Sequence, residues 1–137
     1  PWYGDSMRKI LQGINTDAAF VRPVSKRHCI AELLAHIISW RELLNKRLQG
    51  DNTFDVNQKE SFEWQRFGTN HETAWKNLLN KLEENQKQII QNLERADDTL
   101  LEQKVSRREY TYRYLIQGTM QHDIYHSGQI ALLKKSD

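Results

Sequence analysis

Apolar residues recur every three or four positions along four long segments of this chain, and this helical period constrains its fold more than any other feature. The segments cover about residues 5–20, 25–49, 69–96 and 112–133. No stretch shows the alternation of apolar and polar residues that is typical of a half-buried strand. Amphipathic helices bury their apolar stripes against each other, so the sequence predicts an all-α fold, a four-helix bundle.

Turn-forming and capping residues stand at the ends of these segments. Pro23 ends the first segment, and Gly50, which suits the left-handed position after a helix, follows the second. The third opens with Thr69 and Glu72 at the spacing of a capping box. Thr111 is the expected N-cap of the fourth. These signals predict where each helix begins and ends.

The connection between the second and third helices is long. Residues 51–68 lack a helical period but contain four aromatic residues, Phe54, Phe62, Trp64 and Phe67. Because aromatic side chains favour packing, we expect a crossover loop that lies against the bundle. A shorter connection, residues 97–110, leads to the fourth helix. We expect one domain over residues 1–137 that lacks a few N-terminal residues, since the chain does not begin with Met.

Composition excludes several classes of protein. Twenty basic and eighteen acidic side chains give a formal charge of +2, and the two signs are mixed along the chain, so no nucleic-acid partner is expected. No apolar run approaches the ~20 residues needed to cross a bilayer. The single cysteine, Cys29, has no partner for an internal disulfide. We therefore expect a cytoplasmic protein that acts on a small molecule.

Three of the five histidines are candidate metal ligands. His122 and His126 are four residues apart, so their rings project from one face of the fourth helix, the face expected to point inward. His36 stands among apolar residues of the second helix. A buried imidazole needs a polar partner, and three converging imidazoles match a catalytic zinc-type site with an open position.

Other roles for these histidines remain open on spacing alone. His36 by itself is more often a core histidine that bonds a carbonyl, and a pair spaced like His122 and His126 is as often a surface feature. We interpret His28 and His71 as solvent-facing residues. The sequence lacks the paired histidines of a zincin, the Glu-x-x-His pairs of a di-iron bundle and a phosphate-binding glycine loop.

Several stretches resemble one family. These are residues 30–37 (IAELLAHI), residues 121–130 (QHDIYHSGQI) and the opening PWYG, together with Trp64 and Trp75. They are similar to the DinB-like superfamily over nearly the whole chain, and His-Asp-x-x-His-x-Gly-Gln-Ile is the most specific part. The resemblance implies a four-helix bundle that holds one divalent metal ion, often nickel or zinc, through His36, His122 and His126.

The resemblance leaves the reaction open, because relatives include bacillithiol S-transferases, mycothiol-dependent maleylpyruvate isomerase and proteins annotated only as metal-dependent hydrolases. The ion could activate a low-molecular-weight thiol cosubstrate, which gives a transferase, or a water, which gives a hydrolase. We prefer the transferase because the clearest relatives use thiols. A module that the ion only stabilises is the non-enzymatic alternative. Relatives also lead us to expect a homodimer.

Few residues besides the three ligands are candidates for chemistry. Glu32 could orient a ligand or act as a base, but an exposed charge near the helix start is the preferred reading. Asp123 and Tyr125 flank the histidines of the fourth helix and are candidates to assist a reaction. A salt bridge with an arginine for Asp123 and core packing for Tyr125 explain these residues at least as well. Gln129 could form a hydrogen bond across the bundle or could mark only the packing of the family. Cys29 stands seven residues before His36, too far along the helix to share its ion easily.

Overall fold

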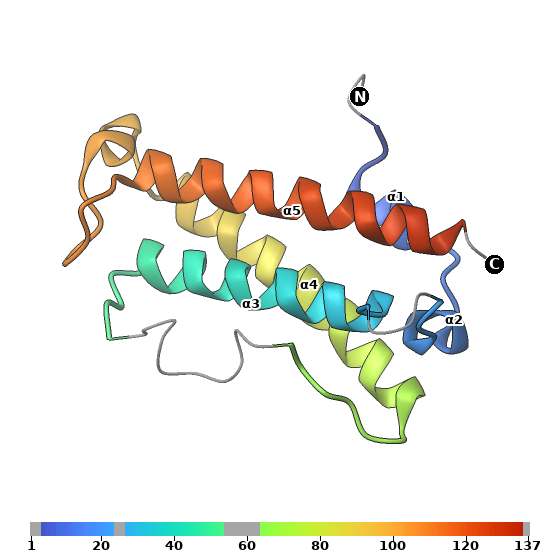
Figure 1. The fold of residues 1–137 in the computed structure, drawn as a ribbon. Coiled ribbons are helices and arrows are strands. Elements are labelled where there is room, and N and C mark those ends of the chain that lie inside the picture. The colour runs from blue at the N-terminus through green and yellow to red at the C-terminus, as the bar shows by residue number, and fades with distance from the viewer. Residues whose placement is uncertain (1–3, 24–26, 54–63, 136–137) are drawn as a thin grey trace.

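Helices make up nearly all the regular structure in the computed structural model, which describes residues 4–23, 27–53 and 64–135. They are α1 (Met7–Leu11), α2 (Thr16–Phe20), α3 (Ile30–Leu48), α4 (His71–Glu94), the 3-10 helix η3 (Asp98–Glu102) and α5 (Tyr112–Lys134) (Figure 1). Within the described residues, β-type pairing is limited to one isolated bridge between Lys104 and Thr111. The predicted all-α class is confirmed.

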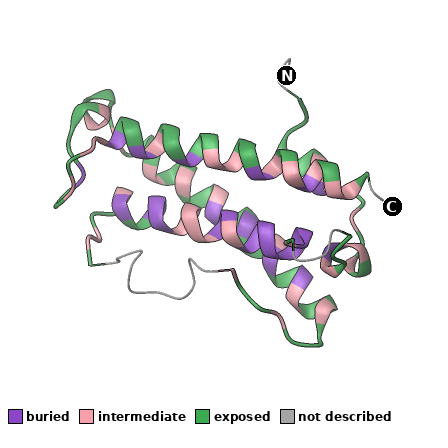
Figure 2. Cartoon of the chain, viewed as in Figure 1, coloured by how far each residue is buried: buried purple, intermediate pink, exposed green. Residues whose placement is uncertain are grey.

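α3 is the helix around which the others pack. It contacts both α4 and α5, while α2 packs against α3 and α4, and α1 packs against α5. α3 and α5 run in opposite directions, so the start of α3 lies beside the end of α5 (Figure 1). Buried positions are correspondingly concentrated on α3 (Figure 2).

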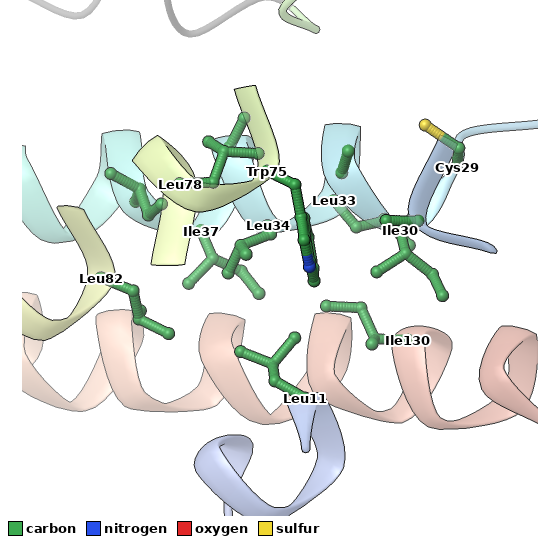
Figure 3. Close-up of a cluster of buried hydrophobic side chains, with 14 residues drawn as sticks. Leu11, Cys29, Ile30, Leu33, Leu34, Ile37, Trp75, Leu78, Leu82 and Ile130 are labelled. Atoms are coloured by element: carbon green, nitrogen blue, oxygen red, sulfur yellow. The ribbon is translucent and has the colours of Figure 1, made fainter. Parts of the chain in front are cut away.

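The main hydrophobic cluster lies where α3, α4 and α5 meet. Its members come from several elements; those labelled in Figure 3 are Leu11, Cys29, Ile30, Leu33, Leu34, Ile37, Trp75, Leu78, Leu82 and Ile130. Leu34, Ile37 and Ile130 expose none of their surface. Burying a side chain of this kind stabilises a protein by about 1.5–3 kcal/mol, so this cluster fixes how α3 and α5 face each other.

The first predicted helix is wrong as a single element, because residues 12–15 separate α1 from α2. Gly13 has a φ of +79°, in the left-handed region that ends a helix. Asn15 then caps α2 through a hydrogen bond from the backbone N–H of Ala18 to its side-chain oxygen (2.9 Å). A continuous helix would lose this cap. Both short helices nevertheless bury apolar residues, as the sequence pattern required.

The remaining helix boundaries follow their capping residues. Gly50 adopts the predicted left-handed conformation after α3 (φ +79°), and Thr111 caps α5 as predicted. The described part of α3 begins at Ile30, later than expected; residues 24–26, where its start was predicted, lie outside the described residues. At α4 the capping box is wrong, because Asn70 rather than Thr69 accepts the hydrogen bond of the N-cap.

The crossover between α3 and α4 can be assessed in its second half. Phe54 and Phe62 lie outside the described residues. Phe67 packs edge-on against Phe20, with ring centroids 5.3 Å apart, and Trp64 packs against the main cluster. These two contacts agree with a loop held to the helices by aromatic residues.

Two general expectations concern the surroundings of the protein. Among the described residues, no helix combines the length and the apolar character that crossing a membrane requires. The homodimer stays a prediction. α5 does expose several large apolar side chains, among them Met120, Ile124 and Leu132.

The break between α1 and α2 yields a stability prediction. Gly13→Ala should lower the free energy of unfolding by about 1 kcal/mol, because a Cβ disfavours the left-handed conformation. No atom lies within 4 Å of a Cβ at this position, so the cost comes from the backbone alone. Gly68→Ala is the matched control, since Gly68 also has open space but no left-handed φ. The left-handed break at Gly13 would be contradicted if urea unfolding gave Gly13→Ala a free energy of unfolding equal to or greater than that of the wild type.

Candidate metal centre

His36, His122 and His126 come together between α3 and α5. Each offers a ligand atom, and these atoms all lie within 4.8 Å of one another. The ring centroids are 4.9 Å apart for His36 and His122, 5.0 Å for His36 and His126, and 4.5 Å for His122 and His126. The antiparallel contact of α3 with α5 brings His36 opposite the pair on α5. The predicted convergence of the three rings is therefore present.

The donor set suits one divalent ion. Three nitrogens that bind a tetrahedral zinc ion at about 2.1 Å lie about 3.4 Å apart, so a small inward movement of the rings would complete the site. His126 is buried, and His36 and His122 are partly buried. Among the described residues, no other group of three or more histidine, cysteine or acidic side chains is arranged in this way.

Gln129 orients the ring of His126. The Nδ1 atom of His126 lies 2.6 Å from Oε1 of Gln129, one turn further along α5. With Nδ1–H donating to the amide oxygen, Nε2 is the nitrogen left for an ion. Such an outer hydrogen bond commonly fixes the tautomer of a metal-binding histidine. Of the roles that the sequence left open for Gln129, a hydrogen bond across the bundle is not the one seen here, because this partner lies on its own helix.

His122 is prepared for binding by its surroundings. Its Nδ1 atom is buried and has no hydrogen-bond partner among the described residues, an arrangement that costs free energy unless a ligand supplies the partner. Burial, with smaller contributions from the charges of His126 and His36, lowers the pKa of His122 to about 4. The ring is thus neutral near pH 7, which is the state that binds a metal.

Two tryptophans border the three histidines. Trp64 stacks on His36 with ring centroids 4.4 Å apart, and the ring centroids of Trp40 and His122 are 5.4 Å apart. Trp64 also stacks on His28, at 3.4 Å. Flat apolar rings packed against imidazoles limit the access of water to their nitrogens.

The prediction that His28 and His71 face solvent is wrong. His28 lies between Trp64 and the carboxylate of Glu32, with Nδ1 3.3 Å from Oε2. His71 stacks on Phe20, with centroids 4.1 Å apart and nearly parallel planes. Neither is in the metal-binding group, so leaving both out of the ligand set is consistent with the structure.

The structure contradicts the predicted environments of Glu32 and Tyr125 and agrees with the expected position of Cys29. Glu32 is buried rather than exposed: it accepts from the backbone N–H of Cys29 (3.0 Å) and pairs with Arg22, so it stabilises the start of α3. Tyr125 is 65% exposed, so its predicted core packing is wrong. Cys29 is buried outside the histidine group, as expected, and burial raises the pKa of its thiol.

Asp123 forms a salt bridge with an arginine, one of the two roles that the sequence left open for it. Arg41 donates from Nε to its Oδ2 (2.7 Å), and from Nη1 to Oε1 of Gln86 (2.7 Å). Each side chain of the pair is 14% exposed. Burial raises the pKa of Asp123 although Arg41 acts in the opposite direction. This cluster joins α3, α4 and α5 beside His122.

Two pockets of about 450 Å³ each open next to the histidines. The first is lined by His122 and by apolar residues of α3 and of the first half of α5. The second is lined by His126, Trp64, Arg27, His28 and residues of the second half of α5. The two linings share none of the described residues. The first lies toward the end of α3 and the start of α5, the second toward the start of α3 and the end of α5, so the three histidines stand between them along the contact of α3 with α5.

Apart from His122, the sequence analysis did not single out the residues that line the first pocket. Tyr114, Gly118 and His122 follow each other at four-residue intervals on α5, and all three line this pocket. This spacing was the available signal, because residues four apart share a helix face.

Comparison with known proteins gives the family. The sequence matches the family model of the DinB superfamily over residues 4–130. Since the match spans most of the chain, the protein belongs to the DinB superfamily, and the resemblance seen in the sequence is confirmed. No curated protein and no solved structure matches.

The Arg41–Asp123 pair generates a prediction about stability. Arg41→Met should lower the free energy of unfolding by about 3 kcal/mol, because the variant leaves a largely buried carboxylate without its cation. Adding Asp123→Asn to Arg41→Met should restore part of this loss. Arg8→Met is the control: Arg8 pairs with Glu83 at the surface, and its loss should cost no more than about 1 kcal/mol. Equal losses for Arg41→Met and Arg8→Met in urea unfolding would show that burial of the pair contributes little.

Proposed function

We propose that the protein binds one divalent metal ion, nickel or zinc, through His36, His122 and His126. The proposal is supported by the convergence of three imidazoles, by the hydrogen bond that leaves Nε2 of His126 available, and by the buried Nδ1 of His122. Three imidazole ligands suit several late transition metals, and they leave at least one position on the ion for another molecule.

We propose further that the protein is an enzyme that transfers a small thiol to an electrophile. The observation that carries this proposal is the pair of separate pockets on either side of the histidines. A transferase must hold two substrates next to one reactive point, whereas hydrolysis needs one substrate and water. The thiol-dependent reactions of relatives within the superfamily agree with this choice.

The roles of the chain's own residues follow from their positions. A divalent ion at this point would supply the positive charge that lowers the pKa of a thiol bound beside it. The thiol gives its proton to solvent, and its sulfur forms a bond to the electrophilic carbon while the leaving group departs with the bonding electrons. Cys29 takes no part, because it is buried away from the site. Asp123 is held by Arg41, so it positions α5 rather than reacting.

Metal content tests the first proposal. Protein purified without chelator should contain about one zinc or nickel ion per chain by elemental analysis, and His122→Ala should contain none. Gln129→Ala should weaken binding by about 10- to 100-fold, because the ring of His126 loses its orienting partner. His71→Ala is the matched control and should bind like the wild type, since its ring stacks on Phe20 outside the site. Wild-type protein that takes up neither metal would refute the site.

Thiol transfer tests the second proposal. The metal-loaded protein should accelerate the reaction of a small thiol with an alkyl halide, and the rate can be measured from the halide released. Cys29→Ser should keep this activity, whereas His36→Ala, His122→Ala and His126→Ala should each lose it, because the ion is no longer held.

Two outcomes would contradict thiol transfer. Activity that persists in a metal-free variant lacking all three histidines would exclude a role for the ion. Cleavage of an ester or amide by the metal-loaded protein without any thiol would instead establish a hydrolase, the alternative left open by the sequence.

A further inference from the structure

The pocket beside His122 has an unusual lining for a site next to a metal-binding group. Three of its side chains are the aromatic rings of Trp40, Tyr110 and Tyr114, and Leu43 and Leu115 add aliphatic surface. Its volume of about 450 Å³ lies within the range of small-molecule sites. The lining reaches His122, so a molecule in this pocket would lie directly against a proposed ligand of the ion.

The described residues that line this pocket carry no formal charge. Among them there is no Asp, Glu, Lys or Arg side chain, and the hydroxyl of Thr119 is already committed to the backbone oxygen of Leu115 (2.9 Å). A charged group placed here would lose hydration without gaining a side chain of opposite charge among these residues. The pocket beside His126 differs, because Arg27 and His28 contribute to it. The two sides of the centre therefore favour molecules of different polarity.

We infer that the electrophilic substrate carries a neutral aromatic or aliphatic group and that the pocket beside His122 binds this group. The inference rests on the proposed transferase function and names the substrate class of that site. Apolar surface removed from water supplies the binding free energy, at roughly 25 cal/mol per Å². With the apolar group held there, the electrophilic carbon lies toward the three histidines, where the thiol sulfur displaces the leaving group.

Gly118 sets the space available to that group. It lies one helical turn before His122 on the same face of α5 and lines the pocket. A Cβ at Gly118 would meet no atom within 4 Å, so this position has open space in front of it. A larger residue here would occupy the pocket without displacing its walls. Gly118 is thus the residue that determines how large an apolar group is accepted.

A binding experiment tests the inference without requiring turnover. The zinc-loaded wild type should bind 2-naphthol, a neutral two-ring probe, in isothermal titration. Gly118→Leu should weaken this binding about tenfold or more, because the new side chain removes apolar contact area, and Gly118→Ala should have a smaller effect. Both substitutions favour a helix over glycine, so the variants should remain folded.

Gly128→Leu is the matched control. Gly128 is on the same helix, has the same open space and lines neither pocket, so its variant should bind 2-naphthol like the wild type. Failure of the wild type to bind the probe, or equal binding by Gly118→Leu, would overturn the inference.

A kinetic comparison separates this inference from the proposed function. With 2-mercaptoethanol as the thiol, Gly118→Leu should raise the KM for N-benzyliodoacetamide several-fold more than the KM for iodoacetamide, which lacks the apolar group. If naphthol binding responds to Gly118→Leu but no variant transfers a thiol, the apolar pocket stands and the transferase proposal fails. If transfer occurs but KM for both electrophiles is insensitive to Gly118→Leu, the transferase stands and the pocket assignment fails.

Discussion

The burial of three imidazoles between α3 and α5 is the constraint on which the other features of this protein depend. Imidazole nitrogens that are removed from water need partners, and His122 has a buried nitrogen without one among the described residues. The same burial, together with the charges of His126 and His36, lowers the pKa of His122 to about 4 and so keeps its ring neutral. An interior of this kind is unfavourable for an apoprotein and favourable for a metal-binding one, which links the local cost to the proposed function.

The surrounding packing holds these rings in place from more than one direction. The main hydrophobic cluster, which includes Trp75, fixes α4 against α3. The Arg41–Asp123 pair together with Gln86 joins all three long helices. Trp64 reaches the rings from the crossover. A metal site needs such support from the surrounding side chains, because its ligand nitrogens must be held within a fraction of an ångström of the productive geometry.

Features set by local periodicity could be predicted from the sequence, and features set by tertiary context could not. The long helices followed from apolar spacing. A four-residue interval and one polar residue in an apolar stripe made the three histidines candidates, and the resemblance to the DinB-like superfamily then implied them as one ligand set. The break at Gly13 was missed because the apolar pattern continues through it while the backbone does not. Glu32 was taken as exposed because nothing local shows that Arg22 returns to pair with it. The pockets depend on which faces of α3 and α5 meet, which no single segment encodes.

Anomalous diffraction from crystals of the metal-loaded protein tests the central claim most directly. Data collected at the absorption edge of zinc or nickel should show one strong peak per chain, about 2.0–2.1 Å from one nitrogen each of His36, His122 and His126. Such a peak would place the ion between the two pockets. A metal-loaded crystal with no peak among these three rings, or with its main peak at other residues, would contradict the account.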